Sequence, residues 1–195
     1  MTKYQSLTIY GILMVATGII LIALSYNPSQ TMQYSVALTM LFSSAFAFWA
    51  TYQSRNIPSS MKYHGLHAIG MLVYGIAILF FATDIQKFFG ITIFFLLYYG
   101  IAEIVFGFQL LMMKQTFISP QGIGIRLFMG FFISLGAIIV LATSYVDQNQ
   151  AILVSGLVFI LSGINLILFK SILKKWHTPP VVVNSEVTMK IPEIG

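Results

Sequence analysis

Apolar residues along the chain gather into six runs, separated by short polar stretches. The runs cover about residues 7–26, 32–52, 65–83, 88–113, 123–144 and 151–173. Each has roughly 19–26 residues, which at 1.5 Å per residue suits a hydrocarbon layer ~30 Å thick. Because a bilayer interior offers no water to backbone groups, the runs are predicted to be helices. The alternating segments of about 10 residues that a membrane barrel needs are absent from the sequence.

Composition supports lipid as the solvent for most of this surface. The 195 residues are 58% hydrophobic and 8% charged, with a mean hydropathy of +0.89, whereas soluble domains carry about 25% charged residues. The sequence contains no cysteine, which removes disulfides, thiolate metal sites and thiol catalysis. The first run is too long for a typical signal peptide, and SYNPSQ after it has no A-x-A cleavage site, so we expect a span there.

Basic residues lie almost entirely on one side of the expected helices. Nine fall on the side of the termini and one, Lys87, on the other. The nine are Lys3, Arg55, Lys62, Lys114, Arg126, Lys170, Lys174, Lys175 and Lys190. We expect Arg126 to extend its side chain to the membrane surface. The asymmetry predicts a multi-pass membrane protein with both termini cytoplasmic, and it argues against a nucleic-acid partner.

The expected fold class is an all-α membrane protein with six transmembrane helices built as three parallel helical-hairpin repeats. The string GIILI from Gly18 is matched by GIAIL from Gly75 and GAIIV from Gly136. We expect a transmembrane domain over residues 1–175, with hairpins at about 7–52, 65–113 and 123–173. Residues 176–195, which contain two prolines in succession, are expected to form a flexible cytoplasmic tail.

Glycines recur at a spacing that places them on one helix stripe. Three pairs are each seven residues apart, close to two helical turns. Small residues on one stripe let helix backbones approach closely, which drives packing in lipid. The candidate helix-packing glycines are Gly11, Gly18, Gly75, Gly100, Gly107, Gly136, Gly156 and Gly163.

Six spans, three hairpins with G-I-x-x-L-like strings, short outer turns and the closing stretch VSGLVFILSGINLI at 154–167 resemble the HdeD family of bacterial acid-resistance membrane proteins. The resemblance covers roughly residues 7–174. It implies a stress-related inner-membrane protein without an established enzymatic activity, and it supplies no catalytic motif.

Glu103 is the residue of the fourth run that most needs an explanation. It lies near the middle of the expected span, with no opposite charge nearby in the sequence. We expect an intramembrane polar cluster in which Tyr99, Tyr74 and Asn165 surround it. Intramembrane acids often mark proton or ion pathways, but one acid without a basic partner favours a role in holding helices together.

Two further candidates lie at the start of the third run. His64 and His67 are three residues apart on one helix face. Two histidines without a third ligand nearby make a poor metal site, so we expect interfacial histidines, no metal and no cofactor. A pH-sensing role for them stays open.

No reaction motif is present in the sequence. It contains neither G-x-S-G nor H-E-x-x-H, and no phosphate loop or dinucleotide fingerprint. The leading hypothesis is a non-enzymatic membrane protein that supports acid or envelope stress tolerance. Its expected partners are the lipid bilayer and a second copy of itself or another membrane protein. The alternative is a small transporter or channel for protons, ions or a small solute that uses Glu103.

Overall fold

The described residues of the computed structural model, 3–55, 58–112 and 120–176, form six helices. The helices are α1 (Lys3–Ala23), α2 (Gln30–Gln53), α3 (Pro58–Phe81), α4 (Ile85–Met112), α5 (Pro120–Ser144) and α6 (Gln148–Trp176). All six are long and apolar enough to cross a membrane. The prediction of an all-helical chain with six candidate spans is therefore confirmed. Of the expected tail, 176–195, the first residue ends α6, and residues 177–195 lie outside the described part of the chain.

Polar residues cap the first turns of α2 and α4, which begin before their apolar runs. Ser29 accepts a hydrogen bond from the Met32 backbone at the start of α2. The Asp84 carboxylate accepts one from the Lys87 backbone at 2.8 Å at the start of α4. Such side-chain oxygens satisfy backbone N–H groups that have no partner within the helix. Capping thus lets α2 and α4 extend into the polar boundary beyond the apolar run.

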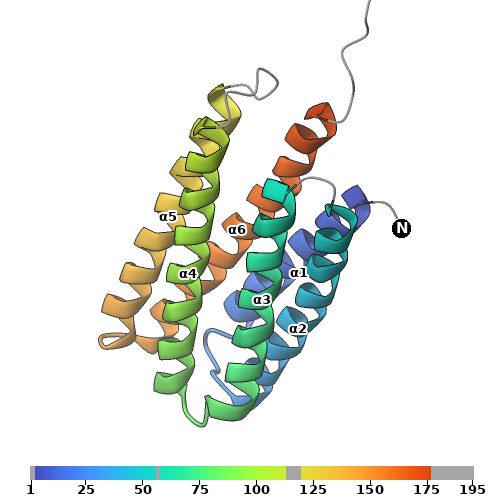
Figure 1. Cartoon of the computed structure of the whole chain (residues 1–195). Helices are drawn as coiled ribbons and strands as arrows, with labels where there is room; N and C mark the ends of the chain where they lie inside the picture. Colours follow the sequence, from blue (N-terminus) through green and yellow to red (C-terminus); the bar gives the residue numbers. More distant parts are fainter. Residues whose placement is uncertain (1–2, 56–57, 113–119, 177–195) are drawn as a thin grey trace, which may run out of the picture.

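The helices form a closed ring in chain order, with α6 returning to α1 (Figure 1). Packing is most extensive between α1 and α6, between α2 and α3, and between α4 and α5. It is least extensive between α3 and α4. The ends of α1 and α6 that lead to the chain termini lie together, and the α1–α2, α3–α4 and α5–α6 turns lie at the other end.

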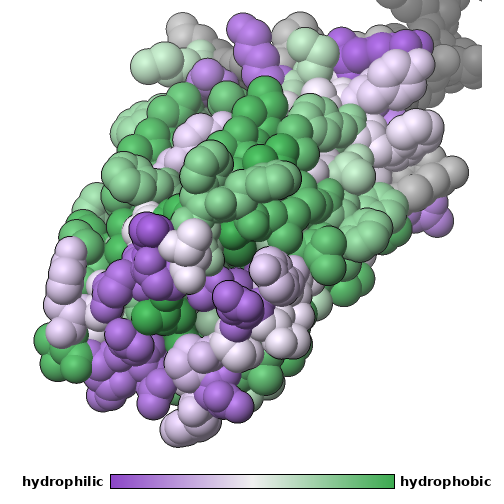
Figure 2. Space-filling view, turned by 90° about the horizontal axis from the view of Figure 1, so that it is seen from below, coloured by the Kyte–Doolittle hydropathy of each residue, from purple (hydrophilic) through white to green (hydrophobic). Residues whose placement is uncertain are grey.

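The outside of the ring is apolar along its length and polar at the end that carries the three turns. Figure 2 shows hydrophilic residues gathered at that end and hydrophobic residues over the helix flanks. Large side chains such as Phe94, Phe128 and Phe131 are exposed on the flanks. A soluble monomer rarely exposes so continuous an apolar surface. This surface fits hydrocarbon surroundings.

Glycines mark the close approach of α1 and α6, which run antiparallel. Gly163 lies against Gly11 and Val15, and Gly156 lies against Gly18 and Ile22. A Cβ added to Gly156 would lie 2.7 Å from the Gly18 carbonyl oxygen. Both backbones therefore occupy the space that a side chain would need, which is the small-residue packing typical of membrane helices.

The remaining candidate glycines face other neighbours in the ring. Gly100 lies against Gly130 and Ser134 of α5, and Gly107 lies against Leu127 of the same helix. Gly75 of α3 contacts Ala37 and Leu41 of α2. Gly136 of α5 contacts Val158 of α6. All eight candidate glycines thus lie in contacts between neighbouring helices.

The interior of the ring changes character along its axis. Toward the turns it holds an apolar aromatic stack, in which the rings of Tyr74 and Phe95 are 4.4 Å apart and those of Phe95 and Phe159 are 5.7 Å apart. Toward the chain termini it holds ionisable groups from several helices. These groups form the candidate functional site.

Candidate functional site: a buried cluster around Glu103

Glu103 is fully buried and paired with a cation from the next helix. Its side chain is 0% exposed, and Arg126 Nη1 donates to its Oε2 at 2.7 Å. The Arg126 side chain is 1% exposed. The expectation that Arg126 reaches the membrane surface is therefore wrong, as is the expectation that Glu103 has no basic partner in the membrane. One of the nine basic residues counted for topology belongs to the core, which leaves eight against one.

The close approach of α4 and α5 places this pair. A Cβ added to Gly130 would lie 2.9 Å from the Cβ of Glu103, so α5 has room for α4 only because residue 130 is glycine. Arg126 is four residues before Gly130, on the same face of α5. Its long side chain therefore points along α4 and reaches the carboxylate. Glu103 lies nine residues before Met112, the last residue of α4, which places it about 14 Å along the helix from that end.

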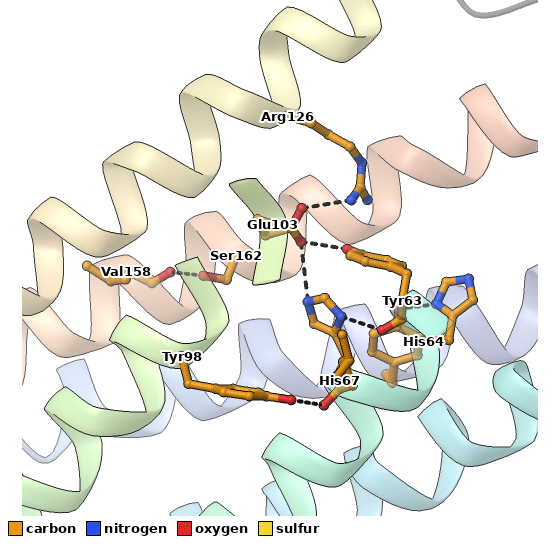
Figure 3. A network of polar contacts seen from close by, with 10 residues as sticks. Tyr63, His64, His67, Tyr98, Glu103, Arg126, Val158 and Ser162 are labelled. Carbon is orange, nitrogen blue, oxygen red and sulfur yellow. Dashed lines mark hydrogen bonds and ion pairs between the residues drawn. The ribbon is translucent and has the colours of Figure 1, made fainter. Parts of the chain in front are cut away.

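α3 supplies the other contacts to the carboxylate (Figure 3). Tyr63 Oη donates to Glu103 Oε1 at 2.6 Å. His67 Nε2 lies 3.5 Å from the same oxygen. Tyr63 and His67 are four residues apart, so one face of α3 presents both to Glu103.

Two aromatic rings lie close to the guanidinium of Arg126. Its central carbon lies 4.6 Å from the centre of the Tyr63 ring and 5.0 Å from that of Phe106. The two rings are stacked on each other with centres 4.0 Å apart. A cation over aromatic faces gains up to about 2 kcal/mol when it is removed from water. This offsets part of the cost of burying the ion pair, which is several kcal/mol per ion.

The cluster continues toward α1 and α2 through further polar groups. Tyr10 of α1 and His64 of α3 are joined by a hydrogen bond of 3.1 Å between Oη and Nδ1. Ser43 of α2 donates to the Tyr10 carbonyl oxygen at 3.1 Å. Polar contacts in the interior of the ring therefore link α1, α2, α3, α4 and α5.

The three predicted neighbours of Glu103, which are Tyr99, Tyr74 and Asn165, make different contacts in the structure. Tyr99 packs against the His67 ring, with centres 4.4 Å apart, but its hydroxyl has no hydrogen-bond partner in the described part of the chain. Tyr74 Oη is instead paired with Thr92 Oγ1 at 3.0 Å. Asn165 is buried, and its Nδ2 likewise has no partner among the described residues. The structure joins none of the three to Glu103 by a hydrogen bond.

The histidines belong to the interior of the ring. His64 is 0% and His67 is 1% exposed, so both side chains face the interior of the ring and neither lies on its outer surface. In residues 3–55, 58–112 and 120–176, no three His, Cys, Asp or Glu side chains gather as a metal site. His67 faces a carboxylate and His64 faces a tyrosine, so the two rings serve separate contacts.

The sequence contains only weak signals that Arg126, Tyr63 and His67 are the partners of Glu103. Arg126 stands alone within an apolar stretch, as Glu103 does, and a lone charge in a span needs a partner. Tyr63 and His67 have the spacing of a helix face. Neither signal says which helices touch, so the pairing could not be read from the sequence.

Comparison of the chain with models of known protein families, with curated proteins and with solved structures found no match in any of the three.

Proposed function

We propose that the chain is a non-enzymatic multi-pass protein of the bacterial inner membrane that supports acid or envelope stress tolerance, as its resemblance to the HdeD family implies. The observation that carries the proposal is the closed core. Glu103 is fully buried, and Arg126 and Tyr63 satisfy its two oxygens. Such a core ties helices together and offers no open site for a substrate.

Two hollows on the described surface support this view because they lie elsewhere. An apolar groove of about 460 Å³ runs between α3 and α4 and is lined by residues such as Val73, Tyr74 and Phe94. A polar hollow lies at the turns, around residues 144–150. Neither is lined by Glu103, Arg126 or His67.

The three-hairpin architecture is part of the same proposal. What supports it is the recurrence of tight packing between successive hairpins, at α2 with α3, at α4 with α5 and at α6 with α1. Glycines occupy each of these contacts. Three equivalent contacts around a ring are what a pseudo-threefold arrangement of parallel repeats requires.

The proposed topology places both termini in the cytoplasm. Its support is the basic residues near the terminal end of the ring, such as Arg55 and Lys62, against Lys87 at the other end. Because the chain has no cysteine, Arg55→Cys and Lys87→Cys can be labelled singly in intact cells with a membrane-impermeant maleimide. We expect labelling of Lys87→Cys alone. Labelling of Arg55→Cys alone would reverse the topology.

The biological role is tested by deletion and complementation. We expect a strain without the gene to lose survival at low pH and to regain it with the parent chain. Gly163→Ala, which disrupts the α1–α6 contact, should restore less survival than Gly90→Ala, where a Cβ meets nothing within 4 Å. Equal survival of the deletion strain and its parent under acid and envelope stress would overturn the proposed role.

A second candidate, a proton or ion transporter, is favoured by one observation. Glu103 lies against His67 and Tyr63 in the interior of the ring, and intramembrane ionisable groups often mark proton pathways. Proteoliposomes with an internal pH dye test this idea. Proton flux in the parent that Glu103→Gln abolishes would support transport, and absence of flux in the parent would exclude proton transport as the function.

A further inference from the structure

The hydrogen-bond geometry of His67 determines where its proton lies. Nδ1 lies 2.9 Å from the backbone carbonyl oxygen of Tyr63. A carbonyl oxygen can only accept a hydrogen bond, so Nδ1 must be the donor and must carry a hydrogen. In the neutral ring, Nε2 is then the nitrogen with the lone pair.

That lone pair points at a carboxylate. Nε2 lies 3.5 Å from Glu103 Oε1 and has no hydrogen-bond partner within the described residues. Two acceptors facing each other in a buried site repel, whereas a proton between them would make a charge-assisted hydrogen bond of about 2.7–2.9 Å. The gap of 3.5 Å is thus wider than such a bond.

The surrounding charges are few and can be named for every helix. Arg126 of α5 opposes a second positive charge, and Glu103 of α4 favours it. The tyrosines Tyr10, Tyr63 and Tyr99 and the ring of His64 complete the titratable neighbours. Neither α2 nor residues 148–168 of α6 contain a charged residue. The Glu103 carboxylate is the charged group that the structure places in contact with Nε2.

We propose that His67 Nε2 is a proton-binding site that clamps α3 to α4 when it is occupied. The seam between α3 and α4 is the least extensively packed in the ring, and the apolar groove lies in it. A new bond from His67 to Glu103 shortens the distance across this seam. The link to acid tolerance rests on the function proposed above, but the site itself is read directly by spectroscopy.

Histidine ¹⁵N NMR of the full chain in lipid nanodiscs tests the site, with His67 assigned from the spectrum of His67→Gln. At pH 8 we expect the neutral tautomer with hydrogen on Nδ1. As the pH is lowered from 8 to 5, we expect a growing signal of the doubly protonated ring. A tautomer with hydrogen on Nε2 at pH 8, or no second proton by pH 5, would overturn the proposal.

Two variants test the role of the carboxylate, because they should change the doubly protonated fraction of His67 in opposite directions. Glu103→Gln removes the charge, so at pH 5 we expect the doubly protonated fraction of His67 to fall at least tenfold. Tyr63→Phe keeps the Glu103–Arg126 pair and removes one donor to Oε1, so this fraction should rise. If Glu103→Gln fails to fold, Tyr63→Phe still decides, because an unchanged or smaller fraction contradicts the site.

The clamp has its own readout. Spin labels on cysteines at Val73 of α3 and Ile101 of α4, both exposed on the flank, report the distance across the seam. We expect a shorter and narrower distance distribution at pH 5 than at pH 8 in the parent, and no change in His67→Gln. The same distribution at both pH values in the parent would overturn the clamp. A deletion strain without an acid phenotype would remove only the biological role.

Discussion

The ion pair between Glu103 and Arg126 predicts a large coupling free energy between the two side chains. Arg126→Met leaves the Glu103 carboxylate buried without its cation, and Glu103→Gln leaves Arg126 buried without its anion. Removing one member of a buried pair costs about 3–5 kcal/mol of unfolding free energy, so two independent losses would sum to about 6–10 kcal/mol. Both side chains are at most 1% exposed, so water cannot replace the missing partner.

The double variant should lose far less than that sum. The amide introduced by Glu103→Gln still offers an oxygen to the Tyr63 hydroxyl, and the thioether introduced by Arg126→Met keeps apolar contact with the Tyr63 and Phe106 rings. The remaining cost is an amide without its full set of partners, about 1–3 kcal/mol. The difference between the summed single losses and the double loss is therefore expected to be about 6 kcal/mol.

Reversible unfolding in mixed micelles, titrated with SDS and followed by circular dichroism, measures these free energies. Arg55→Met is the matched control, because Arg55 is exposed and its removal should change stability by less than about 0.5 kcal/mol. A double variant whose loss equals the sum of the single losses within about 0.5 kcal/mol would show that the two side chains do not interact. That result would refute the buried pair.

Two further predictions concern other parts of the fold. Gly163→Ala should cost about 1–3 kcal/mol in the same assay, because the new Cβ would lie 2.8 Å from the Val15 backbone nitrogen, whereas Gly90→Ala, which meets nothing within 4 Å, should cost little. Equal losses would contradict the close approach of α1 and α6. At the α3–α4 turn, the hydrogen bond from the Lys87 backbone holds the pKa of Asp84 below its usual value. The capping contact therefore stabilises the fold at pH values above the pKa that Asp84 has in the unfolded chain, and this stabilisation is lost as the pH falls through the pKa of Asp84 in the folded chain. Asp84→Asn should remove this small dependence of stability on acid. An identical dependence in the variant would contradict the capping contact.

Local chemistry explains how well the helices could be predicted. Each run is long enough to span a bilayer by itself, and hydrogen bonding within a helix satisfies its backbone without help from other segments. α3 and α5 begin at Pro58 and Pro120. Proline suits the first position of a helix because it has no N–H that the first turn would leave without a partner. Residues before the apolar runs therefore begin these two helices.

The composition of the core could not be predicted in the same way. Arg126 follows Glu103 by 23 residues in the next helix, and the fit of α4 to Gly130 decides that the two meet. Tyr63 and His67 reach the same carboxylate from α3, 40 and 36 residues before it in the chain. In the sequence alone, Glu103 looked like a single polar residue in a span and Arg126 looked like a surface cation. Their role as an ion pair depends on which helix faces are neighbours.

The sequence by itself determined an all-helical chain with six apolar helices, because span length and hydropathy are properties of each segment alone. Only the tertiary structure decided that Arg126 lies inside the ring and that His67 faces a carboxylate. A buried charge is stable only where a partner and a close helix approach coincide, and that coincidence is a property of several helices at once.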